Sequence, residues 1–323
     1  MSLFDEKLLN SPGEPGDSQA AAGASPEAPA RLVGDPLSYA GAAPPAVWIS
    51  FLPEDLRITW SWVHLLVFGL FCIITQFAIG ALVVGYYSIY QHLSQKQLKR
   101  LLESDPKLLI VTSILMFALI ILFLYVTLSV LRGMPFWRTL GWKKLESDPL
   151  AGKGKPWMYF LSGCGLSLFV AIASSRVQNV EHAPIQEFFK SRNGALMLMA
   201  MAVLVAPLAE ETIFRGYLYP VLARIISAIA HFFGMEFPRA IRTGVASSIL
   251  VTGILFGLVH GPQLGGNWAV VALLMLVGVI FTFARAWTGT VLASFFLHLG
   301  YNSMIAITSI IATRGFTRMP PHP

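Results

Sequence analysis

The sequence predicts an all-α, polytopic helical membrane protein with about seven to eight transmembrane helices. Of its 323 residues, 55% are hydrophobic and only 12% are charged, whereas an ordinary globular protein carries about 25% charged residues. The mean hydropathy is +0.64. The apolar residues form long continuous runs rather than an apolar/polar alternation, which favours spanning helices over the strands of a β-barrel.

Composition divides the chain into four expected parts. Residues 1–47 are rich in Pro, Ala, Gly and Ser, and we expect a disordered tail because they cannot bury enough apolar surface to offset chain entropy. Residues 48–176 should hold the amino-terminal transmembrane helices with amphipathic and basic loops. Residues 177–315 should form a second membrane core, and residues 316–323 a short carboxy-terminal tail.

Three uncharged apolar runs predict the first three spans, at 60–90, 108–131 and 157–175. The polar and basic segment 91–107 carries several leucines and predicts a short amphipathic helix on the membrane surface. Segment 184–190 begins with a proline, which suits the first position of another interfacial helix.

Four more spans follow in the second half of the chain. One begins near Ala195 and is followed by 216–233, which continues in helical style; the others cover 243–259, 267–284 and 289–312. We therefore expect a multi-pass protein of the cell membrane, with the lipid bilayer as its surroundings. The net charge of +6 fits Lys and Arg flanking the spans, so no nucleic-acid partner is expected.

Charged residues interrupt the fourth span at Glu210, Glu211 and Arg215. Charges at hydrocarbon depth cost at least a few kcal/mol each, so they usually face a bundle interior or a water-filled cavity. Glu211 and Arg215 are four residues apart with the acid first, the favourable order for a pair on a helix. The interpretation is that Arg215 neutralises Glu211 and leaves Glu210 for chemistry. A buried ion pair alone is the alternative, but one Arg neutralises only one carboxylate.

Two later spans carry residue pairs at the same four-residue spacing, each with a histidine: Phe256 and His260 close the fifth span, and His298 and Asn302 lie inside the seventh. Taken alone, such groups are commonly helix caps or interhelical hydrogen bonds. Together with the two glutamates they supply a base, acid/base imidazoles and donors for an oxyanion, provided that the helices converge.

These three motifs, EExxxR at 210–215, FxxxH at 256–260 and HxxxN at 298–302, resemble those of the CPBP family of intramembrane proteases. That family includes the type II CAAX prenyl endopeptidases and bacteriocin-processing or self-immunity proteins. The resemblance covers roughly residues 184–302 and would make 177–315 a catalytic membrane core. It implies an endopeptidase that acts on a membrane-associated protein or peptide, for instance a lipidated one.

The resemblance also implies roles for the motif residues. Glu210 and His260 would activate a water, while His298 and Asn302 would stabilise the tetrahedral oxyanion. The remaining motif positions, Glu211 and Arg215, would be supporting residues.

No metal cofactor is expected, because HExxH is absent and the two histidines lie on different spans. The alternative is a divalent metal such as zinc, held by Glu210, His260 and His298.

Two other classes of function remain open from the sequence. A proton-coupled transporter also uses intramembrane Glu and His, although no inverted repeat is evident. A non-catalytic membrane scaffold or a bacteriocin self-immunity protein is the second alternative.

Straight parallel helices would not bring Glu210 and His260 to the same depth in the membrane. Counted from Ala195, Glu210 lies well down its helix, whereas His260 lies near the far end of its own. Tilt, or a break near Pro207, is expected to bring them level.

Overall fold

The computed structural model describes residues 52–145, 153–177 and 184–317. The expected disordered tail at 1–47 lies outside these residues. Residues 52–57 belong to a separate compact unit and include one 3₁₀ turn, η3 (Glu54–Leu56). All the other described helices belong to the unit that begins at Ile58.

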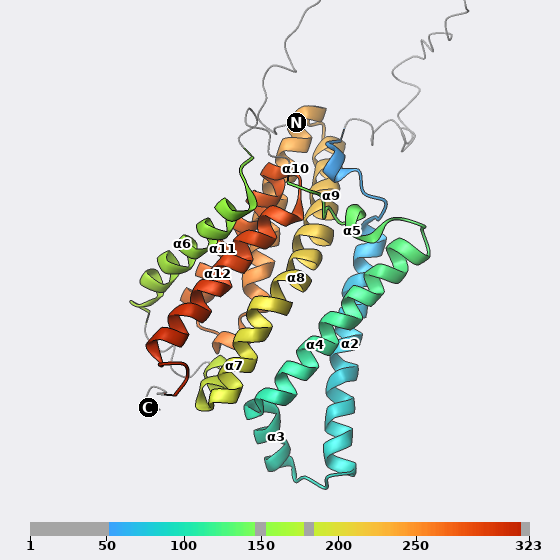
Figure 1. Cartoon of the computed structure of the whole chain (residues 1–323). Coiled ribbons are helices and arrows are strands. Elements are labelled where there is room, and N and C mark those ends of the chain that lie inside the picture. The colour runs from blue at the N-terminus through green and yellow to red at the C-terminus, as the bar shows by residue number, and fades with distance from the viewer. Residues whose placement is uncertain (1–51, 146–152, 178–183, 318–323) are drawn as a thin grey trace, which may run out of the picture. The chain divides into compact units, whose positions relative to one another are not determined.

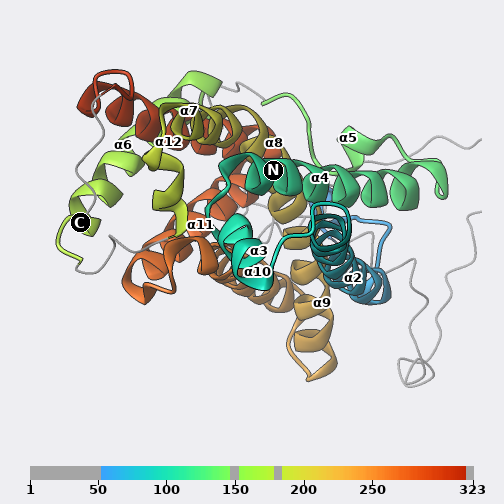
Figure 2. The same cartoon turned by 90° about the horizontal axis from the view of Figure 1, so that it is seen from below.

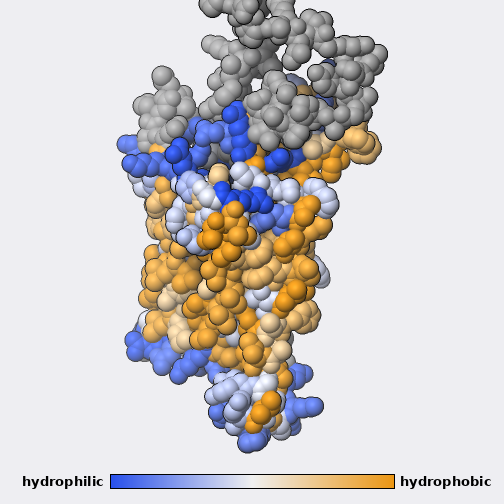
Figure 3. Space-filling view, turned by 90° about the vertical axis from the view of Figure 1, so that its right-hand side faces the viewer, coloured by the Kyte–Doolittle hydropathy of each residue, from blue (hydrophilic) through white to orange (hydrophobic). Residues whose placement is uncertain are grey.

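Within the described ranges every regular element is a helix, and seven helical runs are long and apolar enough to cross a membrane. They are Trp62–Ile89, Pro106–Val130, Pro156–Ser174, Arg192–Phe232, Phe237–Val259, Trp268–Thr288 and Val291–Ala312. The prediction of an all-α, multi-pass membrane protein is confirmed. Figure 3 shows an apolar band on one face of the molecule, with hydrophilic residues at its two ends.

The amino-terminal helices form a hairpin closed by a short helix at one end (Figure 1). Its elements are α2 (Trp62–Ile89), α3 (Gln95–Ser104), α4 (Pro106–Tyr125) and the π-helical turn η4 (Val126–Val130). The sharp turns follow from local capping. Ser94 and Gln97 form a capping box at the start of α3, and Asp105 caps α4 just before its initial proline.

The other helices form the bundle that carries the polar motifs (Figures 1 and 2). In it α6 (Pro156–Ser174) packs along α12 (Val291–Ala312), and α10 (Phe237–Val259) contacts both α9 (Tyr219–Phe232) and α11 (Trp268–Thr288). The α6–α12 contact depends on two glycines. A Cβ on Gly163 would lie 2.0 Å from the Leu297 carbonyl oxygen, and one on Gly300 would lie 2.0 Å from the Phe160 carbonyl oxygen.

This close approach gives a matched test of helix packing. We expect Gly163→Ala to lower the thermal midpoint in detergent, because backbone atoms of α12 leave no room for the methyl group. Gly165→Ala, on the same helix, adds a methyl group with no heavy atom within 4 Å and is expected to leave the midpoint unchanged or slightly raised. Equal midpoints for the two variants would contradict the close packing of α6 and α12.

The motif-bearing fourth span is part of one helical run of 41 residues. It comprises α7 (Arg192–Ala200), the π-helical turn η6 (Met201–Val205), α8 (Ala206–Glu211), the π-helical turn η7 (Thr212–Leu218) and α9. At 1.5 Å per residue the run is about 62 Å long, roughly twice the hydrocarbon core of a bilayer. The helical run continues through Pro207, so the chain does not break there. The π-helical turn η6 comes directly before α8, which contains the proline.

The depth of the two motif residues is set by the hairpin between α9 and α10, which pack against each other. Glu210 lies 22 residues before Phe232, the last residue of α9, and His260 lies 23 residues after Phe237, the first residue of α10. The two positions are thus level when counted from the turn, at about 33–35 Å along each helix. Counting from Ala195 suggested a mismatch because it ignored this hairpin.

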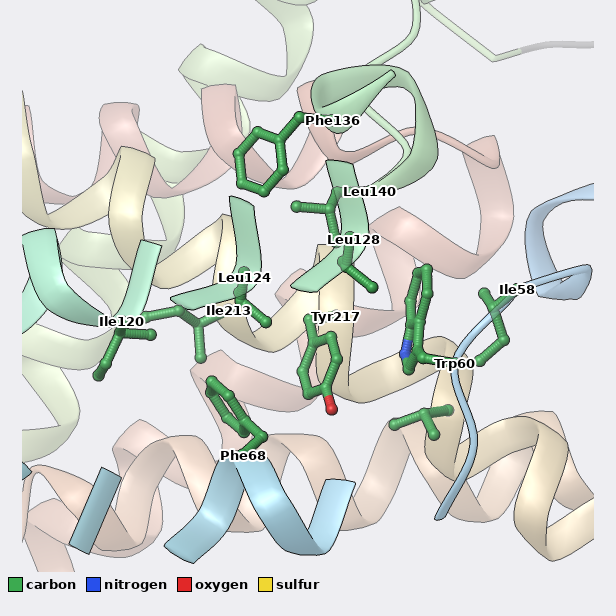
Figure 4. Packing of buried hydrophobic residues seen from close by; sticks show 11 residues of the cluster. Ile58, Trp60, Phe68, Ile120, Leu124, Leu128, Phe136, Leu140, Ile213 and Tyr217 are labelled. Carbon is green, nitrogen blue, oxygen red and sulfur yellow. The ribbon is translucent and has the colours of Figure 1, made fainter. Parts of the chain in front are cut away.

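A buried apolar cluster joins the amino-terminal hairpin to the motif-bearing helix (Figure 4). Phe68 from α2 and Leu124 from α4 surround Ile213 and Tyr217 of η7, and Trp60 stacks on Tyr217 with ring centroids 5.5 Å apart. The helix that carries Glu210 is thereby held from the side of the hairpin as well as by the bundle.

Candidate active site

A fully buried ion pair forms the base of the site. The Nη1 atom of Arg215 donates to Oε1 of Glu211 at 2.8 Å, and neither side chain has solvent exposure. The same Glu211 oxygen lies 3.0 Å from Nδ1 of His298 on α12. The predicted pair is therefore present, and it extends into an Arg215–Glu211–His298 chain that the sequence did not indicate.

The guanidinium of Arg215 is held on its other sides by α11. Its Nε atom donates to the Thr282 hydroxyl at 3.2 Å, and its Nη2 atom donates to the Gly278 carbonyl at 2.9 Å. Sequence reasoning missed both residues. The only signal was their four-residue spacing on one face of an apolar span, which many membrane helices share.

Phe256 links this chain to the fifth span. Its ring lies 4.5 Å from the Arg215 guanidinium carbon and packs against the rings of both His260 and His298. A cation over an aromatic face is stabilised when it is shielded from water. The phenylalanine of the FxxxH motif therefore contacts the Arg of the first motif and both histidines.

Glu210 faces the two imidazoles. Its Oε2 atom lies 3.8 Å from Nε2 of His260 and 3.9 Å from Nε2 of His298. These separations exceed a direct hydrogen bond and suit a shared water. The Oε2 atom is buried and accepts no hydrogen bond from the part of the chain that the structure describes. Side chains from three helices that lie far apart in sequence thus meet around one carboxylate oxygen.

The hydrogen bonds on the far side of each ring assign the histidine tautomers. Nδ1 of His260 lies 2.7 Å from the Phe256 carbonyl oxygen, which can only accept, so Nδ1 carries the proton. Nδ1 of His298 donates to the Glu211 carboxylate for the same reason. In each neutral ring, Nε2 therefore presents a lone pair toward Glu210.

Asn302 lies one helical turn after His298, and its amide is already engaged. The Nδ2 atom donates to the Ala202 carbonyl oxygen at 2.7 Å. Because a carboxamide nitrogen carries two hydrogens, one N–H remains for another acceptor.

The separations around Glu210 are longer than those between the ligands of a zinc ion. Two ligand atoms of a tetrahedral zinc site lie about 3.4 Å apart, less than both separations from the Glu210 oxygen. Among the described residues, no group of three His, Cys, Asp or Glu side chains is arranged to hold a metal ion.

Residues 192–304 match a family model described as type II CAAX prenyl endopeptidase Rce1-like. The matched stretch contains all three motifs, so the resemblance to the CPBP proteases is confirmed for this part of the chain. No curated protein and no solved structure matches the chain.

Proposed function

Because residues 192–304 form a domain of the Rce1-like type II CAAX prenyl endopeptidase family, we propose that this protein is an intramembrane endopeptidase of the cell membrane. Its substrate is a membrane-associated protein or peptide, with prenylated CAAX tails as the first class to test. The observation that carries the proposal is the meeting of Glu210 Oε2 with the Nε2 atoms of His260 and His298.

In this mechanism Glu210 and His260 activate the attacking water. A water between Glu210 Oε2 and His260 Nε2 donates one hydrogen bond to each, since both atoms present lone pairs. As the water oxygen bonds to the scissile carbonyl carbon, one of its protons passes to this pair. The same proton is then delivered to the leaving nitrogen as the C–N bond breaks, which leaves an amine and a carboxylic acid. The acid still carries the second proton of the water and releases it to solvent to become a carboxylate.

The oxyanion of the tetrahedral intermediate is stabilised from α12. His298 donates from Nε2 when both ring nitrogens carry protons, and Asn302 offers its second N–H. Glu211 accepts from Nδ1 of His298 and is itself fixed by Arg215. Glu211 and Arg215 therefore act as positioning residues, because they orient His298 without touching the substrate.

Comparative membrane proteomics tests the proposal in cells. Cells that carry Glu210→Gln in place of the wild type should accumulate at least one uncleaved membrane protein, and its shortened form should be missing. In parallel, a quenched fluorescent peptide with a prenylated CAAX tail, the reporter peptide below, should be cleaved by the purified wild type. Identical proteomes and no cleavage of the reporter peptide would favour a scaffold function.

Metal removal gives a separate prediction. EDTA and phenanthroline are expected to leave cleavage of the reporter peptide unchanged, because the separations around Glu210 exceed those of a zinc site. The measurement is the initial rate before and after dialysis against each chelator. Loss of activity that added zinc restores would replace the metal-free mechanism with one in which Glu210, His260 and His298 are ligands.

A further inference from the structure

The carbonyl of Ala202 lacks the main-chain donors that a helix normally provides. In an α-helix its donor would be the N–H of Ala206, but that group bonds to Met201, five residues back, as part of the π-helical turn η6. The next candidate, at the five-residue spacing, is Pro207, which has no N–H. The π-helical turn and the proline together release one carbonyl within a membrane span, where an unpaired polar group is costly.

The side chain of Asn302 supplies the missing donor at 2.7 Å. It comes from α12, which also carries His298 four residues earlier on the same face. One hydrogen bond therefore joins the helix that carries Glu210 to the helix that carries His298. Its acceptor, the carbonyl of Ala202, lies five residues before Pro207 and eight before Glu210.

We propose that Asn302 is a positioning residue for Glu210, in addition to any contact with substrate. Its amide replaces the main-chain donor missing at Pro207 and thereby retains the π-helical turn η6. Such a turn adds one residue to the helical path, so its loss would rotate the following residues by about 100°. Glu210 would then no longer face the Nε2 atoms of His260 and His298. The proposal rests on the catalytic role of Glu210 given above.

The same helix contains an internal control. In the second π-helical turn, η7, the N–H of Tyr219 bonds to Phe214, five residues back, and Pro220 follows. The backbone arrangement around Pro220 thus repeats that around Pro207, but Asn302 donates to η6 and not to η7. In a variant that lacks the Asn302 amide, restoring a main-chain N–H should therefore recover activity at residue 207 and not at residue 220.

The test is a double-mutant cycle in the full-length protein in detergent. Asn302→Ala is expected to lower kcat for the reporter peptide by about 10²-fold, with KM changed far less. Pro207→Ala restores an N–H near the Ala202 carbonyl, and in the Asn302→Ala background it should recover kcat by at least about tenfold. Pro220→Ala in that background should recover nothing.

Thermal midpoints of the same variants supply a readout that does not depend on substrate. Asn302→Ala should lower the midpoint less in the Pro207→Ala background than in the wild type, even if Pro207→Ala is itself inactive. Equal decreases in both backgrounds, with no recovery of kcat, would overturn the positioning role and leave Asn302 as an oxyanion donor only. A wild type that fails to cleave would instead count against the proposed function, while coupling of the midpoints would still support the contact.

Discussion

Glu210→Gln is expected to lower the rate of peptide hydrolysis by about 10²–10⁴-fold, the range for loss of a general base. The amide keeps the size of the side chain but cannot take a proton from the water held toward His260. The measurement is the initial rate of cleavage of the reporter peptide by purified protein. Because Glu210 Oε2 accepts no hydrogen bond from the described residues, the substitution should leave the thermal midpoint within a few degrees of the wild type.

His260→Ala should cause a similar loss, and combining it with Glu210→Gln should add little, since groups that act on one water are not additive. Glu187→Gln is the matched control, because that glutamate is on η5 (Pro184–Lys190) and pairs with Lys190 at the surface. It should retain the wild-type rate. Cleavage by Glu210→Gln at the wild-type rate would remove the catalytic assignment and favour a scaffold.

Much of the fold could be predicted because the signal lies within single segments. The seven apolar runs predicted all seven spans, and most of the bounds were right to within a few residues; the largest difference in a starting residue is at the fifth. There the predicted span starts at 243, whereas α10 begins at Phe237. Its second residue is a proline, and its first turns carry Arg239 and Arg242. The Glu211–Arg215 pair was equally predictable, because four-residue spacing fixes neighbours on one helix whatever surrounds it.

The contacts between helices could not be predicted in the same way. Nothing in the sequence of this apolar span distinguishes Thr282 and Gly278 as the groups that bind Arg215. The partner of Asn302 could not be predicted because the sequence left tilt or a break near Pro207 as the alternatives, whereas the helix continues through the proline after a π-helical turn. Sequence spacing shows which groups share a helix face. It does not show which backbone carbonyl loses its main-chain donor where the helix changes locally from α to π.

The buried ion pair leads to the other large expected effect. Arg215→Met leaves the Glu211 carboxylate without its cation at a site with no solvent exposure. Such a loss costs about 3–5 kcal/mol, and the thermal midpoint should fall on the order of 10 °C. Arg224→Met is the control on the same helical run. That half-buried arginine donates to the Ile58 carbonyl, and its removal should cost less because it leaves a neutral acceptor rather than a charge.

A second substitution separates stability from catalysis. Glu211→Leu added to Arg215→Met removes both charges, and apolar replacement of a buried pair is commonly neutral or stabilising. The midpoint should therefore recover toward the wild type. Hydrolysis should not recover, because Nδ1 of His298 loses the oxygen that orients the ring. A double variant with wild-type stability and wild-type kcat would show that the pair only supports the fold. Recovery of the thermal midpoint without recovery of kcat would show that Glu211 and Arg215 orient His298.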